Sequence, residues 1–372
     1  MALDHVRHYF HYDAFLFDPM DFSKTTGAIY FTRWITHFCA PVFMFLSGTS
    51  SYFVGRRKSK KELSVFLLTR GLWLMVLELF IANLAWSFDL SYNVFLINVI
   101  WVFGISMIIM AGLVHLPFGV ILGIGIFIVA GHHLFDGISV EGGGIGTLLW
   151  SLFHKPGLWT FSGKTVFVVY PLIPWVGVMA LGYCMGRLYD RDFSESRRIK
   201  VLATIGLGCV FTFVVLRSGN FYGDPSHWSK QSSAFFSFLS FLNTSKYPPS
   251  LLFLLMTLGP ALLFLSAADR VRGKVVEIIS IYGQVPLFYY LLHILIIHAF
   301  ATLAAALSPG FSASDMILRQ SFLDTSHLNG FGFSLFTTYV IWIAIVALLF
   351  PLCKWYHGYK KRNKEKVVLS YL

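Results

Sequence analysis

The sequence predicts an all-α protein: a polytopic transmembrane helix bundle of about nine spans plus the remnant of an N-terminal tenth. Of its 372 residues, 56% are hydrophobic and only 13% are charged, whereas soluble domains average about 45–50% and about 25%. The mean hydropathy is +0.68. The apolar runs are long and unbroken, which disfavours a β-barrel, because barrel strands alternate apolar and polar residues.

The spans follow from the length of each apolar run. A helix needs about 20 apolar residues to cross a bilayer core of about 30 Å. Runs of this kind lie at 27–55, 63–86, 93–113, 116–135, 163–188, 199–217, 248–267, 275–305 and 331–353. The first and the eighth are long enough to tilt or to protrude from the bilayer. Met1–Phe10 is too short to cross alone, so it is either an interfacial segment or the tail of a tenth helix. On the second interpretation residues 1–26 are the outer end of a truncated first helix and an outer loop. The chain 1–372 is then a single integral membrane domain with a basic tail at 354–372.

The net charge of +11 is explained by where the basic residues lie. They follow the first, fifth, seventh and ninth spans: Arg56, Arg57, Lys58, Lys60, Lys61, then Arg187, Arg191, Arg197, Arg198, Lys200, then Arg270, Arg272, Lys274, then Lys354, Lys360, Lys361, Arg362, Lys364 and Lys366. If the spans alternate in direction, all these loops share one side, which the positive-inside rule places in the cytoplasm. The charge is therefore a topology signal and not a sign of nucleic-acid binding, and the C-terminus is predicted to be cytoplasmic.

A few ionisable side chains lie inside the apolar runs, where each costs at least about 2.5–3.5 kcal/mol on insertion scales and indicates function. They are Arg33 and His37 in the first span, Arg70 and Glu78 in the second, and His293 and His298 in the eighth. Eleven of the 13 histidines fall in outer loops or outer half-helices. Because histidine exchanges protons near neutral pH, we predict a proton-handling or acyl-transfer site that opens to the outer face.

Structural interpretations of the same residues remain open. Arg33 and Arg70 are placed to snorkel toward a membrane surface, and Glu78 is compatible with a role as partner of an arginine. His37 and His293 are compatible with satisfied core positions. The sequence contains no H-E-x-x-H, H-x-H or Cys–His pairing, so no metal is expected.

Several stretches together resemble a known family. They are Met1–Arg7, Ile35–Gly48 (ITHFCAPVFMFLSG), Arg70–Trp73 with Glu78, Tyr170–Trp175 (YPLIPW), Lys246–Ser250 (KYPPS) and Val285–His293 (VPLFYYLLH). With these stretches the chain resembles the transmembrane acyltransferase superfamily, more specifically the bacterial DUF1624 proteins, which are similar to the catalytic domain of heparan-alpha-glucosaminide N-acetyltransferase. The resemblance implies about ten spans and the transfer of an acyl group, an acetyl group in the nearest case, from cytoplasmic acyl-CoA to an extracytoplasmic sugar, glycan or amine.

The resemblance also suggests roles for individual residues. His5 matches a histidine late in the first helix that the superfamily needs, whereas the basic residue expected before it would precede Met1. His5 would act as a base or as a transient acyl carrier, with Asp4 or another carboxylate orienting it. His37, Arg33 and His293 would stabilise the oxyanion or bind the acceptor. Further candidates for substrate contact are Arg70, Glu78, His298, Lys246 and Tyr289.

Other functions are compatible with the same residues. A proton-coupled transporter or channel would use the Arg, Glu and His groups as a relay, although no internal repeat supports it. A structural partner in an envelope complex is a third interpretation. The expected partners are the lipid bilayer, acyl-CoA and the acceptor, the expected location is the bacterial inner membrane, and a homo-oligomer is compatible with all of these predictions.

Overall fold

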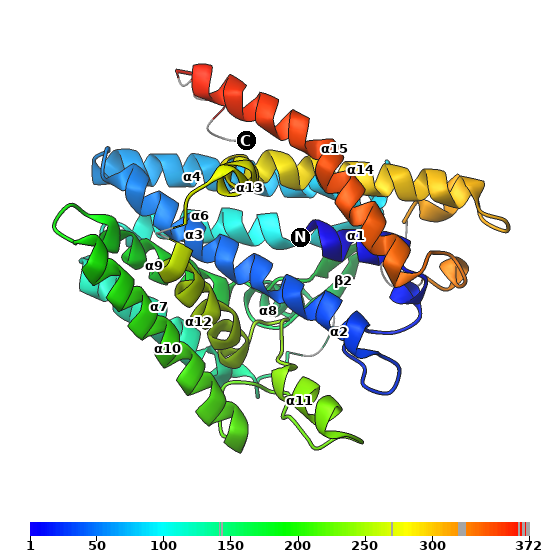
Figure 1. The fold of residues 1–372 in the computed structure, drawn as a ribbon, viewed down its shortest axis with the longest axis horizontal. Helices are drawn as coiled ribbons and strands as arrows, with labels where there is room; N and C mark the ends of the chain where they lie inside the picture. The colour runs from blue at the N-terminus through cyan, green and yellow to red at the C-terminus, as the bar shows by residue number, and fades with distance from the viewer. Residues whose placement is uncertain are drawn as a thin grey trace. The chain divides into compact units, whose positions relative to one another are not determined.

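The protein divides into two compact units in a computed structural model that describes residues 1–140, 142, 144–268, 271–318, 325–363, 365–366 and 369. One unit holds Met1–Thr36, Phe80–Val94 and Val271–Leu372, and the other holds His37–Leu79 and Phe95–Arg270. Figure 1 shows that helices dominate both. Of the basic residues that predict the topology, Arg270 and Lys364 lie outside the described residues.

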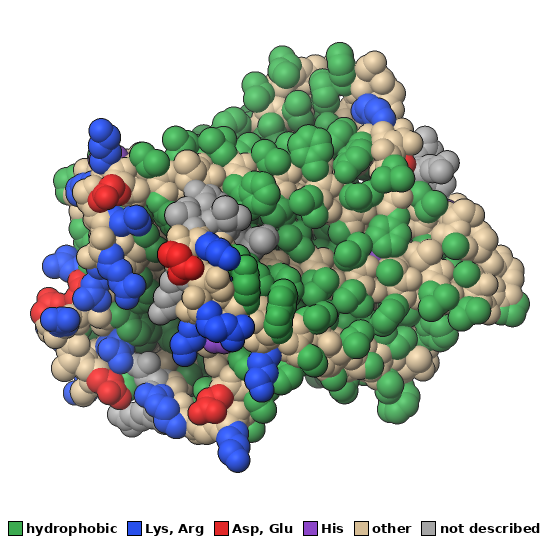
Figure 2. Space-filling model, turned by 90° about the horizontal axis from the view of Figure 1, so that it is seen from above, with side chains coloured by type: hydrophobic (Ala, Val, Ile, Leu, Met, Phe, Trp, Pro, Cys, Tyr) green, Lys and Arg blue, Asp and Glu red, His purple; other side chains and the backbone are tan. Residues whose placement is uncertain are grey.

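Seven stretches of helix are long and apolar enough to cross a membrane: Gly27–Gly55, Lys60–Ser87, Phe118–Phe135, Glu195–Gly219, Leu251–Ala268, Pro286–Leu307 and Leu335–Arg362. Each coincides with a predicted span, and the predicted all-α polytopic bundle is confirmed. Hydrophobic side chains cover much of the surface visible in Figure 2. Contact between so large an apolar surface and water would be unfavourable, whereas contact with the hydrocarbon of a lipid bilayer is not.

The elements of the first unit are mostly helical. They are α1 (Ala2–Phe10), a 3₁₀ turn η1 (Tyr12–Phe15), α2 (Gly27–Trp34), α5 (Asn83–Ser87), α13 (Lys274–Gln284), α14 (Pro286–Leu307), the 3₁₀ turns η6 (Ala313–Met316) and η7 (Ser326–Leu328), and α15 (Leu335–Arg362). Helix α1 packs against α2, α14 and α15. Its end is fixed because Phe333 donates its backbone N–H to the carbonyl of Phe10 at 2.7 Å.

The second unit adds a small sheet to its helices. Its elements are α3 (Cys39–Gly55), α4 (Lys60–Leu77), β1 (Val94–Ile97), α6 (Val99–Leu113), α7 (Phe118–Gly131), η4 (His132–Phe135), α8 (Ile145–Phe153), β2 (Gly157–Phe161), β3 (Lys164–Val168), α9 (Ile173–Met185), η5 (Gly186–Tyr189), α10 (Glu195–Gly219), α11 (Ala234–Leu242) and α12 (Leu251–Ala268). The 3₁₀ turn η2 (Ile35–Phe38) and the π-helical turn η3 (Glu78–Ala82) cross the unit boundaries, and so does β1, whose first residue Val94 belongs to the first unit. The strand order is β1-β3-β2, and β2 pairs antiparallel with β3.

Glycines set the closest helix contacts of the second unit. A Cβ added to Gly48 in α3 would lie 2.0 Å from the carbonyl oxygen of Met179 in α9, and one added to Gly182 would lie 1.9 Å from that of Phe45. Gly71 in α4 and Gly104 in α6 face each other in the same way, at 2.5 and 2.6 Å. Small residues let membrane helices approach until their backbones touch, and dispersion then replaces the hydrophobic effect as the attractive force.

A buried arginine organises the segment that follows α10. The Arg217 guanidinium donates to four backbone carbonyls, those of Ser226, Ser240, Phe241 and Asn243. The side chain is 1% exposed, and it replaces water as hydrogen-bond donor for carbonyls at the end of α11.

Three predicted spans differ in detail from the structure. The span expected at 163–188 begins with strand β3, and the one expected at 93–113 begins with β1, so α9 and α6 are shorter than predicted. The span expected at 275–305 is two helices, α13 and α14, because Val285 precedes Pro286 and leaves the helical conformation, with φ −132° and ψ 49°; proline disfavours the helical region for the residue before it. The predicted tail at 354–372 starts inside α15, which continues to Arg362.

Candidate functional site

Two histidines that are distant in the sequence meet inside the first unit. The Nδ1 atom of His5 in α1 lies 2.8 Å from Nε2 of His293 in α14. The Nδ1 atom of His293 lies 2.7 Å from the backbone carbonyl of Tyr289, one turn earlier in α14. His293 is fully buried, whereas His5 is half-buried.

The hydrogen bonds fix the proton positions on both rings. A carbonyl oxygen only accepts, so Nδ1 of His293 carries a proton, and Nε2 of a neutral His293 is then an acceptor. His5 therefore donates from Nδ1 and keeps the lone pair of its Nε2. Among the described residues, Nε2 of His5 has no hydrogen-bond partner. Because the ring is held by its Nδ1, the lone pair on Nε2 points in a defined direction and is able to act as a base.

Aromatic rings surround the histidine pair. The rings of His5 and His293 are 8° from parallel, and Tyr289 stacks on His293 with the same angle. Trp86 in α5 meets His5 edge-on with ring centroids 4.7 Å apart. Trp86 was not among the predicted site residues, because a tryptophan in an apolar run is ordinarily packing.

Two ion pairs lie next to His5 in the chain. Asp4 accepts from Arg33 in α2 through a short contact and from Arg7 in α1 at 3.4 Å. The hydrogen bond that the structure gives His5 is to His293, and the orientation of His5 by Asp4 stays a prediction. Asp4 ties α1 to α2 through its ion pair with Arg33.

His298, one turn beyond His293, is in a different situation. Its Nδ1 lies 2.9 Å from the carbonyl of Ala85 and its Nε2 lies 2.8 Å from that of Met316. The ring is fully buried and stacks on Phe88 with centroids 3.8 Å apart. Because both nitrogens face backbone carbonyls, this geometry favours a structural role.

The remaining predicted site residues, His37, Arg70, Glu78 and Lys246, belong to the second unit. The Oε2 atom of Glu78 accepts from the backbone N–H groups of Ile100 and Trp101 at 2.8 and 3.2 Å. A carboxylate at a helix N-terminus stabilises that helix, so Glu78 caps α6.

The other three make ring contacts. His37 is buried with its ring centroid 5.4 Å from that of Phe253. The charged groups of Arg70 and Lys246 lie over the rings of Phe66 and Tyr247, at 5.8 and 5.2 Å. Within the described residues, no group of three or more His, Cys, Asp or Glu side chains is placed to hold a metal ion.

A second histidine cluster lies in the second unit. Asp136 accepts from His133 at 2.7 Å and from His154 at 2.9 Å. Nε2 of His133 in turn accepts the backbone N–H of Leu251 at the start of α12. Burial lowers the pKa of His154, and the hydrogen bond to Asp136 opposes this shift. The cluster ties together the end of α7, the end of α8 and the start of α12.

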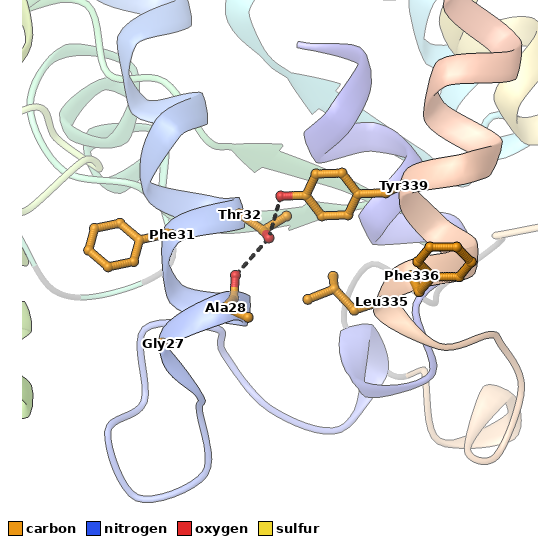
Figure 3. Close-up of a pocket in the computed structure, with 7 residues that line it drawn as sticks. All are labelled: Gly27, Ala28, Phe31, Thr32, Leu335, Phe336 and Tyr339. Atoms are coloured by element: carbon orange, nitrogen blue, oxygen red, sulfur yellow. Dashed lines mark hydrogen bonds between the residues drawn. The ribbon is translucent and has the colours of Figure 1, made fainter.

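The first unit also contains an open groove between α2 and α15, shown in Figure 3. Its volume is about 610 Å³, and it is lined by Gly27, Ala28, Phe31, Thr32, Leu335, Phe336 and Tyr339. Thr32 and Tyr339 face each other across it (Figure 3), with their hydroxyl oxygens 2.9 Å apart. This groove was not predictable from the sequence, because its walls come from segments about 300 residues apart.

The long apolar helices define a polytopic membrane protein, and the titratable groups buried among them are candidates for function. A family model described as "Heparan-alpha-glucosaminide N-acetyltransferase, catalytic" matches residues 7–218, more than half of the chain. The chain therefore belongs to this family of membrane acetyltransferases, and the resemblance noted in the sequence is confirmed. The match includes Arg33, His37, Arg70 and Glu78, whereas His5 precedes it and His293 follows it. No curated protein and no solved structure matches the chain significantly.

Proposed function

We propose that the protein transfers an acetyl group from cytoplasmic acyl-CoA to a hydroxyl or amine acceptor on the extracytoplasmic side of the membrane. The observation that carries the proposal is the orientation of His5, whose Nδ1 is bound by His293 while its Nε2 keeps a lone pair. Family membership supports the reaction class. The basic loops support an orientation with the C-terminus in the cytoplasm.

In this mechanism His5 is the catalytic base. Its Nε2 accepts the acceptor's proton while the acceptor oxygen or nitrogen attacks the thioester carbonyl carbon of acyl-CoA. The carbon–sulfur bond then breaks, the acyl group stays on the acceptor, and the sulfur leaves as the thiol after taking the proton from His5. His293 is a positioning residue, because its neutral Nε2 accepts from the imidazolium that forms on His5 and stabilises it.

The alternative chemistry uses His5 as the acyl carrier. Its Nε2 would attack the thioester directly, and the acceptor would then attack the acyl-imidazole. Both routes need the same lone pair, so the tautomer imposed by His293 serves either. Rapid denaturation of the protein with labelled acetyl-CoA distinguishes them, because only the carrier route leaves label on wild-type protein that His5→Ala lacks.

The test offers radiolabelled acetyl-CoA to membranes that contain the full chain and a membrane extract as acceptor pool. We expect His5→Ala to remove the labelled product. His293→Ala should lower the rate by about 10²–10⁴-fold, the usual contribution of acid–base catalysis, and His293→Gln, which keeps an acceptor, should recover part of it. His115→Ala is the matched control, because His115 is remote from this site in the sequence and its backbone carbonyl accepts from Lys60.

Equal product from wild type and His5→Ala would refute the role of His5. Uptake driven by a pH gradient in proteoliposomes, without any dependence on CoA, would instead favour the transporter interpretation.

A further inference from the structure

The groove between α2 and α15 lies at the ends of two membrane-spanning helices. Gly27 and Leu335 are the first residues of the candidate spans Gly27–Gly55 and Leu335–Arg362, and both line the groove. From Gly27 to Thr32 and from Leu335 to Tyr339 the helices rise about 6–8 Å at 1.5 Å per residue. If the two spans begin at the membrane surface, we expect the groove near the boundary between headgroups and hydrocarbon on one face of the bilayer, whose half-thickness is about 15 Å.

The lining of the groove suits a hydrocarbon chain with a polar end. Five of the seven lining residues are apolar or glycine, and Phe31 and Phe336 are 36% and 79% exposed. The polar contribution is a hydroxyl pair. The Thr32 hydroxyl donates to the carbonyl of Ala28 at 2.7 Å, so the Tyr339 hydroxyl is the donor in its contact with Thr32. The Tyr339 oxygen keeps its lone pairs and accepts from a hydroxyl or amine.

The helices that form the groove also contact the helix that carries His5. Helix α1 packs against both α2 and α15. Arg33, the residue after Thr32, forms an ion pair with Asp4, and Asp4 precedes His5 in α1. Both walls of the groove are thus in contact with α1, the helix of the proposed catalytic base.

We propose that the groove receives the hydrocarbon chain of a lipid-linked acceptor, which enters sideways from the bilayer and presents a hydroxyl or amine headgroup to His5. This inference rests on the proposed acyl transfer and names its acceptor class as an amphiphile instead of a water-soluble glycan. The Tyr339 hydroxyl orients the headgroup, and the apolar walls exclude water from its chain.

The first experiment maps binding and is independent of activity. The full chain in phosphatidylcholine nanodiscs is irradiated with an alkyl glucoside that carries a diazirine in its chain and an alkyne tag, and the labelled peptides are identified. We expect labelling of the segments around Gly27–Thr32 and Leu335–Tyr339. Ala28→Trp fills the groove from an exposed position and should lower this labelling about tenfold, the effect of roughly two lost methylene contacts.

Ala306→Trp is the matched control, because Ala306 is also an exposed alanine near the end of a span, in α14, and does not line the groove. Phe336→Ala opens the groove without adding bulk and provides a second variant if Ala28→Trp fails to fold. Equal labelling of wild type and both groove variants would overturn the proposal.

The second experiment separates the two proposals. Labelled acetyl-CoA is supplied with lipid extract and soluble glycans, and the products are partitioned between organic and aqueous phases. Label in the organic phase that decreases with Ala28→Trp and persists with Ala306→Trp supports the lipid-linked acceptor. Label in the aqueous phase alone overturns it while leaving acyl transfer intact. Absence of label from both phases refutes acyl transfer and, with it, the acceptor.

Discussion

Replacement of Gly48 by alanine tests whether α3 and α9 are held in backbone contact. The new Cβ would lie 2.0 Å from the Met179 carbonyl oxygen and 2.7 Å from the Tyr183 nitrogen, whereas ordinary contact starts at 3.4 Å. The shortfall of 3.4 − 2.0 = 1.4 Å is against backbone, so a side-chain rotation does not relieve it. The two helices must separate or rotate.

The separation has a second cost. Thr49 donates its hydroxyl proton across the same interface to the Gly182 carbonyl at 2.9 Å, and interhelical hydrogen bonds in membranes contribute about 0.6 kcal/mol on average. Overpacking a well-packed interface costs about 1–3 kcal/mol, occasionally more. We therefore expect Gly48→Ala to lower the free energy of unfolding by roughly 2–4 kcal/mol.

Gly208→Ala in α10 is the matched control, because a Cβ there would meet nothing within 4 Å. It should stabilise the protein by about 0.5–1 kcal/mol through the entropy of the unfolded chain. Unfolding by a denaturing detergent, followed by circular dichroism, measures both variants. The reasoning is refuted if Gly48→Ala is as stable as wild type, or if Gly208→Ala loses as much stability as Gly48→Ala.

Three further predictions concern buried polar groups. Arg217→Lys should destabilise the protein by about 3–5 kcal/mol, because the lysine ammonium cannot reproduce all four hydrogen bonds that the buried guanidinium donates. Faster limited proteolysis between residues 220 and 247 would report this loss of stability. His298→Phe keeps a ring for Phe88 but removes the N–H group that donates to a backbone carbonyl, either that of Ala85 or that of Met316, so thermal unfolding in detergent should show a loss of about 1–3 kcal/mol. His154 has a lowered pKa because of its burial, so as pH falls below its ordinary value of 6.5 the unfolded state takes up protons first and stability decreases. The melting temperature of wild type should therefore fall between pH 7 and pH 5 more steeply than that of His154→Gln, and parallel curves would contradict the assignment.

The spans were predictable because composition and run length determine which segments enter a bilayer. The break inside 275–305 was also readable, since Val285 precedes a proline. The hairpin of β2 and β3 has its own signal, the pair Ser162 and Gly163, which take φ of 48° and 76° as a tight two-residue turn requires. The sequence analysis did not predict the hairpin, because the apolar residues of β3 fit the span expected at 163–188 and β2 falls in the loop before that span.

The helix pairing was not predictable in the same way. Gly48 and Gly182 each contact the other's helix, although they are 134 positions apart in the sequence. The apolar runs around them have no polar or apolar face that would indicate which helix is the partner. The same holds for His5 and His293, which are 288 residues apart. The sequence identified His293 as a costly residue inside a span and His5 through the family resemblance, but their pairing depends on the packing of α1 against α14.

The structure separates the buried polar residues by what their atoms contact. Both nitrogens of His298 face backbone carbonyls, and Oε2 of Glu78 accepts two backbone N–H groups. Contacts of this kind hold the fold and favour a structural role for both residues, although their part in substrate binding stays a prediction. His5 has one nitrogen hydrogen-bonded to His293, and among the described residues its other nitrogen has no hydrogen-bond partner. A catalytic base must be oriented by the fold and still have a lone pair available, which is why we propose His5 for that role.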